Sequence, residues 1–173
     1  MQNPFQQRTD AIKIWTANLI QLACTVFLVR FGQGLLAAAS TNFFVDTLGL
    51  SGKQVLWLNG IREIPGLFLI FIAALLVRLP LSRRAALAVI LMGTGYGLYA
   101  VANSYISLIA MVLIASVGFH NWGPLNSSLG LSLTTKENSG RVLGALGAVG
   151  SMAAIVGMGT LALLSTRLRL RAF

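Results

Sequence analysis

A stretch of 51 residues, from position 85 to position 135, contains no Asp, Glu, Lys or Arg. As one α-helix it would be about 76 Å long, whereas the hydrocarbon core of a bilayer is about 30 Å thick. The chain must therefore turn once, and the polar sequence Asn103-Ser104-Tyr105 is the natural place. This feature predicts two membrane-crossing helices, over about residues 85–102 and 105–133.

Composition points to a bilayer for the whole chain. Charged residues make up 10% and apolar residues 56%, whereas about 25% of the residues of soluble domains are charged. The net charge of +9 comes from thirteen basic residues at the borders of apolar runs. This placement is typical of membrane-edge anchors and not of a nucleic-acid-binding face with interleaved aromatics. We therefore expect the lipid bilayer as a partner, and no nucleic acid.

Five membrane spans are predicted in all. They are helical, because the alternating strand pattern of a membrane barrel does not occur and lipid tolerates only helices or closed barrels. The first apolar run is interrupted only by Arg30. The predicted fold class is an all-α membrane protein with five transmembrane helices. The bundle extends over residues 14–166, with spans at about 14–45, 55–77, 85–102, 105–133 and 142–166.

Loop charges predict the orientation of these spans. The first connection has Lys53 as its only basic residue and the third has none. The other loops and the N-terminal segment are basic, so the positive-inside rule places them in the cytoplasm. Residues 1–13 are thus expected to be a cytoplasmic segment, not a removable signal peptide, in a plasma membrane such as a bacterial inner or cell membrane. The basic residues are Arg8, Lys13, Arg78, Arg83, Arg84, Lys136 and Arg141.

Two of the basic loops carry a family resemblance. Residues 136–144, with the sequence KENSGRVLG, resemble the loop between helices four and five of the major facilitator superfamily. Residues 77–84, VRLPLSRR, resemble the family signature between helices two and three. They depart from it because Val77 replaces an acid and Pro80 and Ser82 replace the glycine turn. The arginine often found in helix four of the family is missing, and the fifth span has no Gly-Pro pair, so the signature of drug antiporters is not met.

The resemblance implies an architecture and a function. The chain is similar to about helices one to five of twelve, an incomplete N-terminal six-helix bundle. Residues 167–173 would then be a basic end before a missing sixth span. The implied function is secondary transport of a small, unidentified solute, with coupling to protons or ions. The missing helices or a partner would be needed for a complete transporter, so the chain alone is expected to be inactive.

Polar residues inside the spans are the candidate pathway residues. An arginine at the centre of a helix costs about 3 kcal/mol on insertion scales and therefore usually faces a cavity or a partner. A histidine near a proline bend could titrate and couple solute movement to protons, or could make a fixed interhelical hydrogen bond. The pathway candidates are Arg30, Gln33, Glu63, His120 and Asn121. The candidate cytoplasmic gating residues are Arg78, Arg83, Arg84, Gly140 and Arg141.

Arg30 has two interpretations. It could attract an anionic solute, or it could form a structural ion pair with Glu63. Arg62 and Glu63 are adjacent, so we expect them to point to different faces of their helix and not to satisfy each other. Only one of them is then expected to meet Arg30.

Glycines at helical spacing predict close helix packing. They occur in the sequence GTGYG over residues 93–97 and in a row through the fifth span. The members of that row are Gly140, Gly144, Gly147 and Gly150.

Enzymatic activity is not expected. The His-Glu-x-x-His and Gly-x-Ser-x-Gly patterns do not occur in this sequence, and no Gly-rich nucleotide loop follows a strand. Cys24 is the only cysteine, which leaves no disulfide framework or thiolate metal site. We expect no metal and no cofactor. The alternative to transport is a non-transporting small integral membrane protein or partner subunit.

Overall fold

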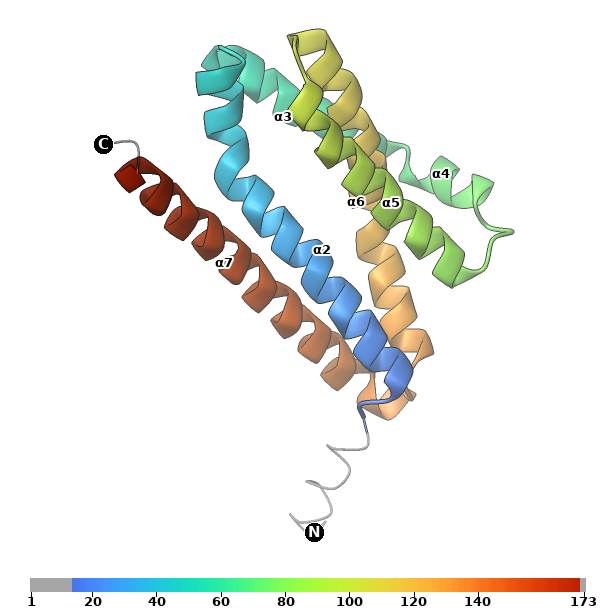
Figure 1. The fold of residues 1–173 in the computed structure, drawn as a ribbon. Helices are drawn as coiled ribbons and strands as arrows, with labels where there is room; N and C mark the ends of the chain where they lie inside the picture. The colour runs from blue at the N-terminus through green and yellow to red at the C-terminus, as the bar shows by residue number, and fades with distance from the viewer. Residues whose placement is uncertain (1–13, 172–173) are drawn as a thin grey trace.

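A computed structural model describes residues 14–171 of the chain, and the side chains up to Arg167. This part of the protein is all-helical, which confirms the predicted fold class at that level (Figure 1). The elements are α2 (Ala17–Asn42), the π-helix η1 (Phe43–Thr47), α3 (Gly52–Leu67), α4 (Leu69–Leu75), α5 (Leu81–Leu98), the 3-10 helix η2 (Tyr99–Val101), α6 (Tyr105–Ser132), the 3-10 helix η3 (Lys136–Asn138) and α7 (Ser139–Arg171).

Within residues 14–171, four helical segments are long and apolar enough to cross a membrane: Ala17–Thr47, Leu81–Val101, Tyr105–Ser132 and Lys136–Arg167. The second predicted span differs from a single helix, because α3 and α4 meet at an angle of 44°. Its break at Phe68 follows Pro65, whose missing N–H removes a hydrogen bond from the preceding turn.

Polar side chains determine where several helices begin. The Thr16 hydroxyl accepts a hydrogen bond from the Leu19 N–H at the start of α2. Ser51 with Gln54, and Ser104 with Ser107, form reciprocal caps at the starts of α3 and α6. The predicted turn at residues 103–105 therefore ends in a capped helix start.

Two helix pairs form the body of the protein. α2 runs alongside α7 in the same direction (Figure 1). The two backbones approach closely where Gly34 faces the backbone of Ala154 and Gly157 faces the carbonyl of Phe31. A Cβ atom at either glycine would collide with the opposite backbone. Small residues thus allow the tight packing that drives association of apolar helices in lipid.

The second pair, α5 and α6, is antiparallel. Gly95 of α5 lies against the backbone of Ala115, and Gly118 of α6 lies against Ala88 and Met92. α6 also packs along α3, so it is the central helix of the bundle. Of the glycines predicted to pack, Gly95 and Gly150 make such contacts. A Cβ would meet nothing within 4 Å at Gly93, Gly97, Gly140, Gly144 or Gly147, so the prediction is wrong for these.

Contacts at both ends show that α2 and α5 run in the same direction. The rings of Phe44, after α2, and Tyr99, after α5, have centroids 6.0 Å apart. Near the other end, Asn18 and Ser82 line one cavity. The chain from η1 to α5, which contains α3 and α4, therefore returns from one end of the bundle to the other.

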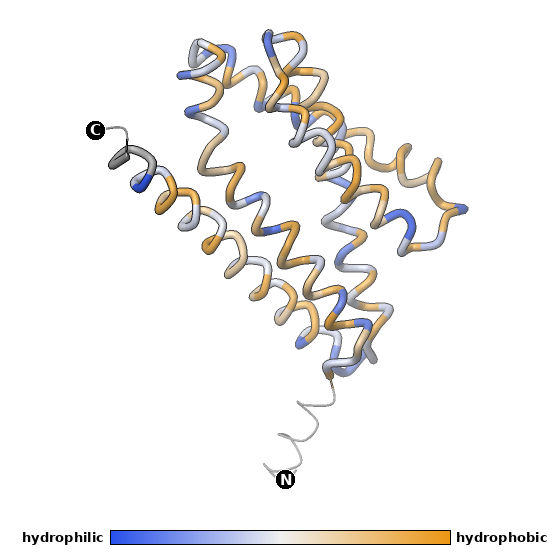
Figure 2. The backbone as a smooth tube through the Cα atoms, viewed as in Figure 1, coloured by the Kyte–Doolittle hydropathy of each residue, from blue (hydrophilic) through white to orange (hydrophobic). Residues whose placement is uncertain are grey.

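Hydrophobic residues occur along all the helices (Figure 2). Many large apolar side chains are exposed on the exterior. Leu75 is 82% exposed, Ile106 81% and Leu67 78%. An apolar exterior of this extent is suited to lipid. Two buried clusters lie inside, one around Leu22 and Val142 and one around Phe44 and Leu108.

Candidate functional site

A polar cluster lies where α3 and α6 pack together. The Glu63 carboxylate is 3.2 Å from Nε of Arg62 and, through its other oxygen, 3.4 Å from Nε2 of His120. Although Nε2 of His120 lies 3.4 Å from the carboxylate, it forms no hydrogen bond with any of the described residues. The contact becomes an ion pair when the imidazole is protonated. Glu63 thus joins two helices through a titratable side chain.

Gly66, near the end of α3, provides the space that His120 occupies. Gly66 lies one residue after Pro65, and a Cβ at Gly66 would lie 2.9 Å from Nδ1 of His120. The absent side chain lets the imidazole rest against the backbone of α3. Ser116, one turn before His120 and 1% exposed, donates a hydrogen bond to the Arg62 carbonyl. This bond fixes α6 to α3 beside the cluster.

The arrangement corrects one sequence prediction. Arg62 and Glu63 do satisfy each other, although they are neighbours in the chain. The prediction considered only the directions of the Cβ atoms, and both side chains are long enough to bend toward each other. Both ion pairs formed by the described residues involve Glu63, and neither involves Arg30. The proposed Arg30–Glu63 pair is therefore not formed.

Arg30 belongs to a second polar group. Its guanidinium donates to the Gln33 amide oxygen at 3.2 Å, and the Gln33 amide nitrogen lies 3.3 Å from the sulfur of Met92 on α5. The Arg30 stem lies against α7, where Gly150 leaves room for it. Arg30 itself is exposed. Two of the predicted pathway residues, Arg30 and Gln33, thus lie together and away from Glu63.

Asn121 does not join the Glu63 cluster. It is 7% exposed, and its amide donates to the Val117 carbonyl at 2.8 Å. It lines a cavity between α4, α5 and α6 together with Arg84. The other predicted gating residues, Arg78, Arg83, Gly140 and Arg141, are exposed and distributed over two loops and helix starts.

Sequence reasoning missed several polar residues near the cluster. Ser116 was overlooked, although its position four residues before His120 places it on the same helix face. A cavity of about 70 Å³ adjoins Arg62 at the η1 side of the bundle. Its polar wall includes Ser40, Asn59 and Tyr99, which come from three different elements. No spacing rule relates such residues before the helices are packed.

Among residues 14–171, no three His, Cys, Asp or Glu side chains gather as a metal site. The arrangement offers instead exposed carboxylate and guanidinium groups and a half-buried imidazole on an otherwise apolar helix bundle. Comparisons with protein-family models, curated proteins and solved structures found no match.

Proposed function

We propose that this bundle forms one wall of a solute pathway in a secondary transporter similar to the major facilitator superfamily. The observation that carries the proposal is the position of three ionisable residues. Arg30, Glu63 and His120 lie near the midpoints of residues 17–42, 52–75 and 105–132. In helices that cross a bilayer, such positions fall near its midplane, where transporters place their solute and coupling-ion sites.

Exposure of these charges supports a pathway wall. The side chains of Arg62 and Glu63 are 46% and 56% exposed, and Arg30 is also exposed. Charged groups at the bilayer centre are costly when they face lipid, so they face water or protein. A water-filled pathway, closed on its far side by further helices or a partner, would solvate Arg30, Arg62 and Glu63.

The proposal includes five spans, with the N-terminal segment and the basic loops in the cytoplasm of a cell membrane. α3 and α4 together form the bent second span. Support comes from the direction of the chain, because α2 and α5 run in the same direction and the connection between them must return. Residues 52–75 correspond to about 36 Å of helix, enough to cross the hydrocarbon core.

Proton coupling is assigned to the contact between Glu63 and His120. Protonation of the imidazole strengthens its attraction to the carboxylate, whereas protonation of Glu63 removes it. Because the residues belong to α3 and α6, either event changes the attraction between two helices. An alternating-access cycle requires such a link between ion binding and helix movement.

A non-transporting partner subunit is the second candidate. The exposed charges of Arg30, Arg62 and Glu63 are consistent with a partner subunit if a second protein, rather than water, covers them. The two functions therefore differ in what meets Arg30 and Glu63 in the membrane.

Cysteine accessibility separates the two functions. In a Cys24→Ala background, we expect Arg30→Cys and Glu63→Cys to react with a charged, water-soluble thiol reagent in native membranes. The reason is that thiols react as thiolates, which form in water and not in lipid. Leu28→Cys is the matched control, because Leu28 is 68% exposed on the same helix as Arg30 and lines a cavity whose walls are apolar except at Gln33 and Tyr96.

The expected result is fast labelling at positions 30 and 63 and none at position 28. Unreactive cysteines at both polar positions would contradict the pathway and favour the partner subunit. Equal labelling at all three positions would mean that the bundle is not embedded in lipid as proposed.

A further inference from the structure

A second polar feature lies away from the Glu63 cluster, in a cavity of about 420 Å³ between α4, α5 and α6. Arg84 lines this cavity, and its Nε atom is buried without a hydrogen-bonding partner among the described residues. A buried charged donor without an acceptor is costly, so the guanidinium is suited to a ligand with an acceptor oxygen. No carboxylate of the described residues forms a salt bridge with Arg84.

The local charge specifies the sign of the ligand. Every residue that lines the cavity lies between positions 69 and 128. The chain has no Asp or Glu between residues 64 and 136, whereas Arg78, Arg83 and Arg84 lie close together at the start of α5. An anion is therefore favoured, and a guanidinium binds phosphate oxygens well because its N–H groups form a planar fork. Asn121 and Ser128 add polar groups to the same wall.

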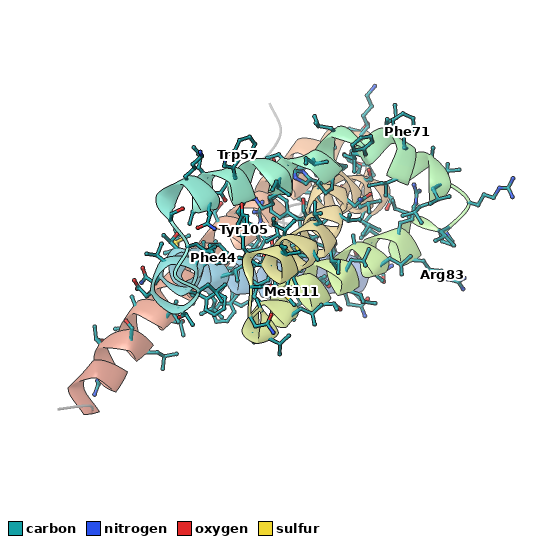
Figure 3. The ribbon with its side chains drawn as sticks, turned by 90° about the horizontal axis from the view of Figure 1, so that it is seen from above. Phe44, Trp57, Phe71, Arg83, Tyr105 and Met111 are labelled. Carbon is teal, nitrogen blue, oxygen red and sulfur yellow. The ribbon has the colours of Figure 1, made fainter. Side chains whose placement is uncertain are left out.

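The remaining walls specify what carries the phosphate. Ala73 of α4, Leu76 directly after α4 and Leu125 of α6 line the cavity next to Arg84. On its outer side α4 exposes apolar residues such as Phe71, which is directed away from the bundle (Figure 3). Arg84 lies near the first residue of α5, a helix that is long enough to cross a membrane. The ends of such helices lie at the level of the lipid headgroups. A phosphate with attached acyl chains fits both the polar and the apolar walls.

We propose that this cavity binds the headgroup of an anionic phospholipid, with Arg84 contacting the phosphate and α4 contacting the acyl chains. The anionic headgroup is preferred to a zwitterionic one, because the cavity has no carboxylate to pair with a choline or ethanolamine cation. This site is separate from the proposed solute pathway and does not depend on transport.

The test compares lipid retention by the full chain and two charge-matched variants. Each protein is reconstituted in vesicles of phosphatidylcholine and phosphatidylglycerol in equal parts, extracted in mild detergent, and examined by native mass spectrometry. We expect the unaltered protein to retain phosphatidylglycerol preferentially. Arg84→Gln should lower that retention about tenfold, as for loss of a charge-assisted contact. Arg83→Gln should leave it unchanged, because the Arg83 side chain is directed away from the bundle (Figure 3).

A third variant keeps the test decisive if Arg84→Gln fails to fold. Ala73→Trp fills the cavity with Arg84 intact and should also abolish the preference. Inorganic phosphate added to the extracted protein should not displace the lipid, because it lacks acyl chains. Equal retention of both lipids by the unaltered protein, equal losses in the Arg83 and Arg84 variants, or displacement by phosphate would each overturn the proposal.

Discussion

Gly95→Ala is expected to destabilise the bundle by about 1–3 kcal/mol, the range for overpacking of a well-packed interior. The new methyl group would collide with the backbone of Ala115, which cannot move unless α5 and α6 separate. Gly93→Ala is the matched control on the same helix, because a Cβ there meets nothing within 4 Å. That variant should not destabilise the bundle, because Ala is favoured over Gly inside a helix by about 0.5–1 kcal/mol.

The measurement is reversible unfolding of each variant in mixed micelles with increasing SDS, followed by circular dichroism. Equal effects of the two substitutions would show that α5 and α6 do not pack through Gly95. In that case the central helix pair of the fold would be wrong.

Leu108→Ala should destabilise the protein by about 2 kcal/mol, whereas Ile106→Ala should have little effect. Leu108 is 0% exposed and packs in the cluster around Phe44, while Ile106 is 81% exposed two residues earlier on α6. The expected loss of stability lies at the low end of the range measured for buried Leu→Ala substitutions in soluble proteins. In a bilayer the unfolded side chain is still in an apolar medium, so only lost packing contributes.

The same SDS unfolding measurement checks this pair. A larger loss for Ile106→Ala would mean that the exposed face of α6 packs against another protein in the membrane. Equal small losses would contradict the packing around Leu108.

The all-helical fold could be predicted because it depends on local and composition-level features. The charge-free residues 85–135 are too long for one span, and Ser104 caps the helix that follows the turn. Which face of each helix is buried could not be predicted. The helices are apolar on all sides, so periodicity carries no signal. Gly93 and Gly95 look alike in sequence, and the position of α6 alone distinguishes them.

The candidate site could be predicted only as a set of unusual residues. Arg30, Glu63 and His120 can be recognised as candidates in the sequence because ionisable groups are rare in apolar helices. Their partners depend on tertiary packing: His120 reaches Glu63 because α6 packs against α3 and Gly66 leaves space for the ring. Asn121, next to His120 in the chain, faces the Arg84 cavity instead. Two adjacent residues of α6 thus belong to different sites: His120 to the Glu63 cluster and Asn121 to the Arg84 cavity.

The five-span topology is the central claim, because the pathway requires α3 and α4 to cross the bilayer as one bent span. The most direct test is labelling of single cysteines in the Cys24→Ala background with a membrane-impermeant maleimide, on intact cells and on opened cells. We predict that Gly52→Cys and Asn103→Cys label on intact cells, and that Leu79→Cys labels only after the cells are opened. Labelling of Leu79→Cys on intact cells, from the same side as Gly52→Cys, would make α3 and α4 a re-entrant segment and contradict the five-span account.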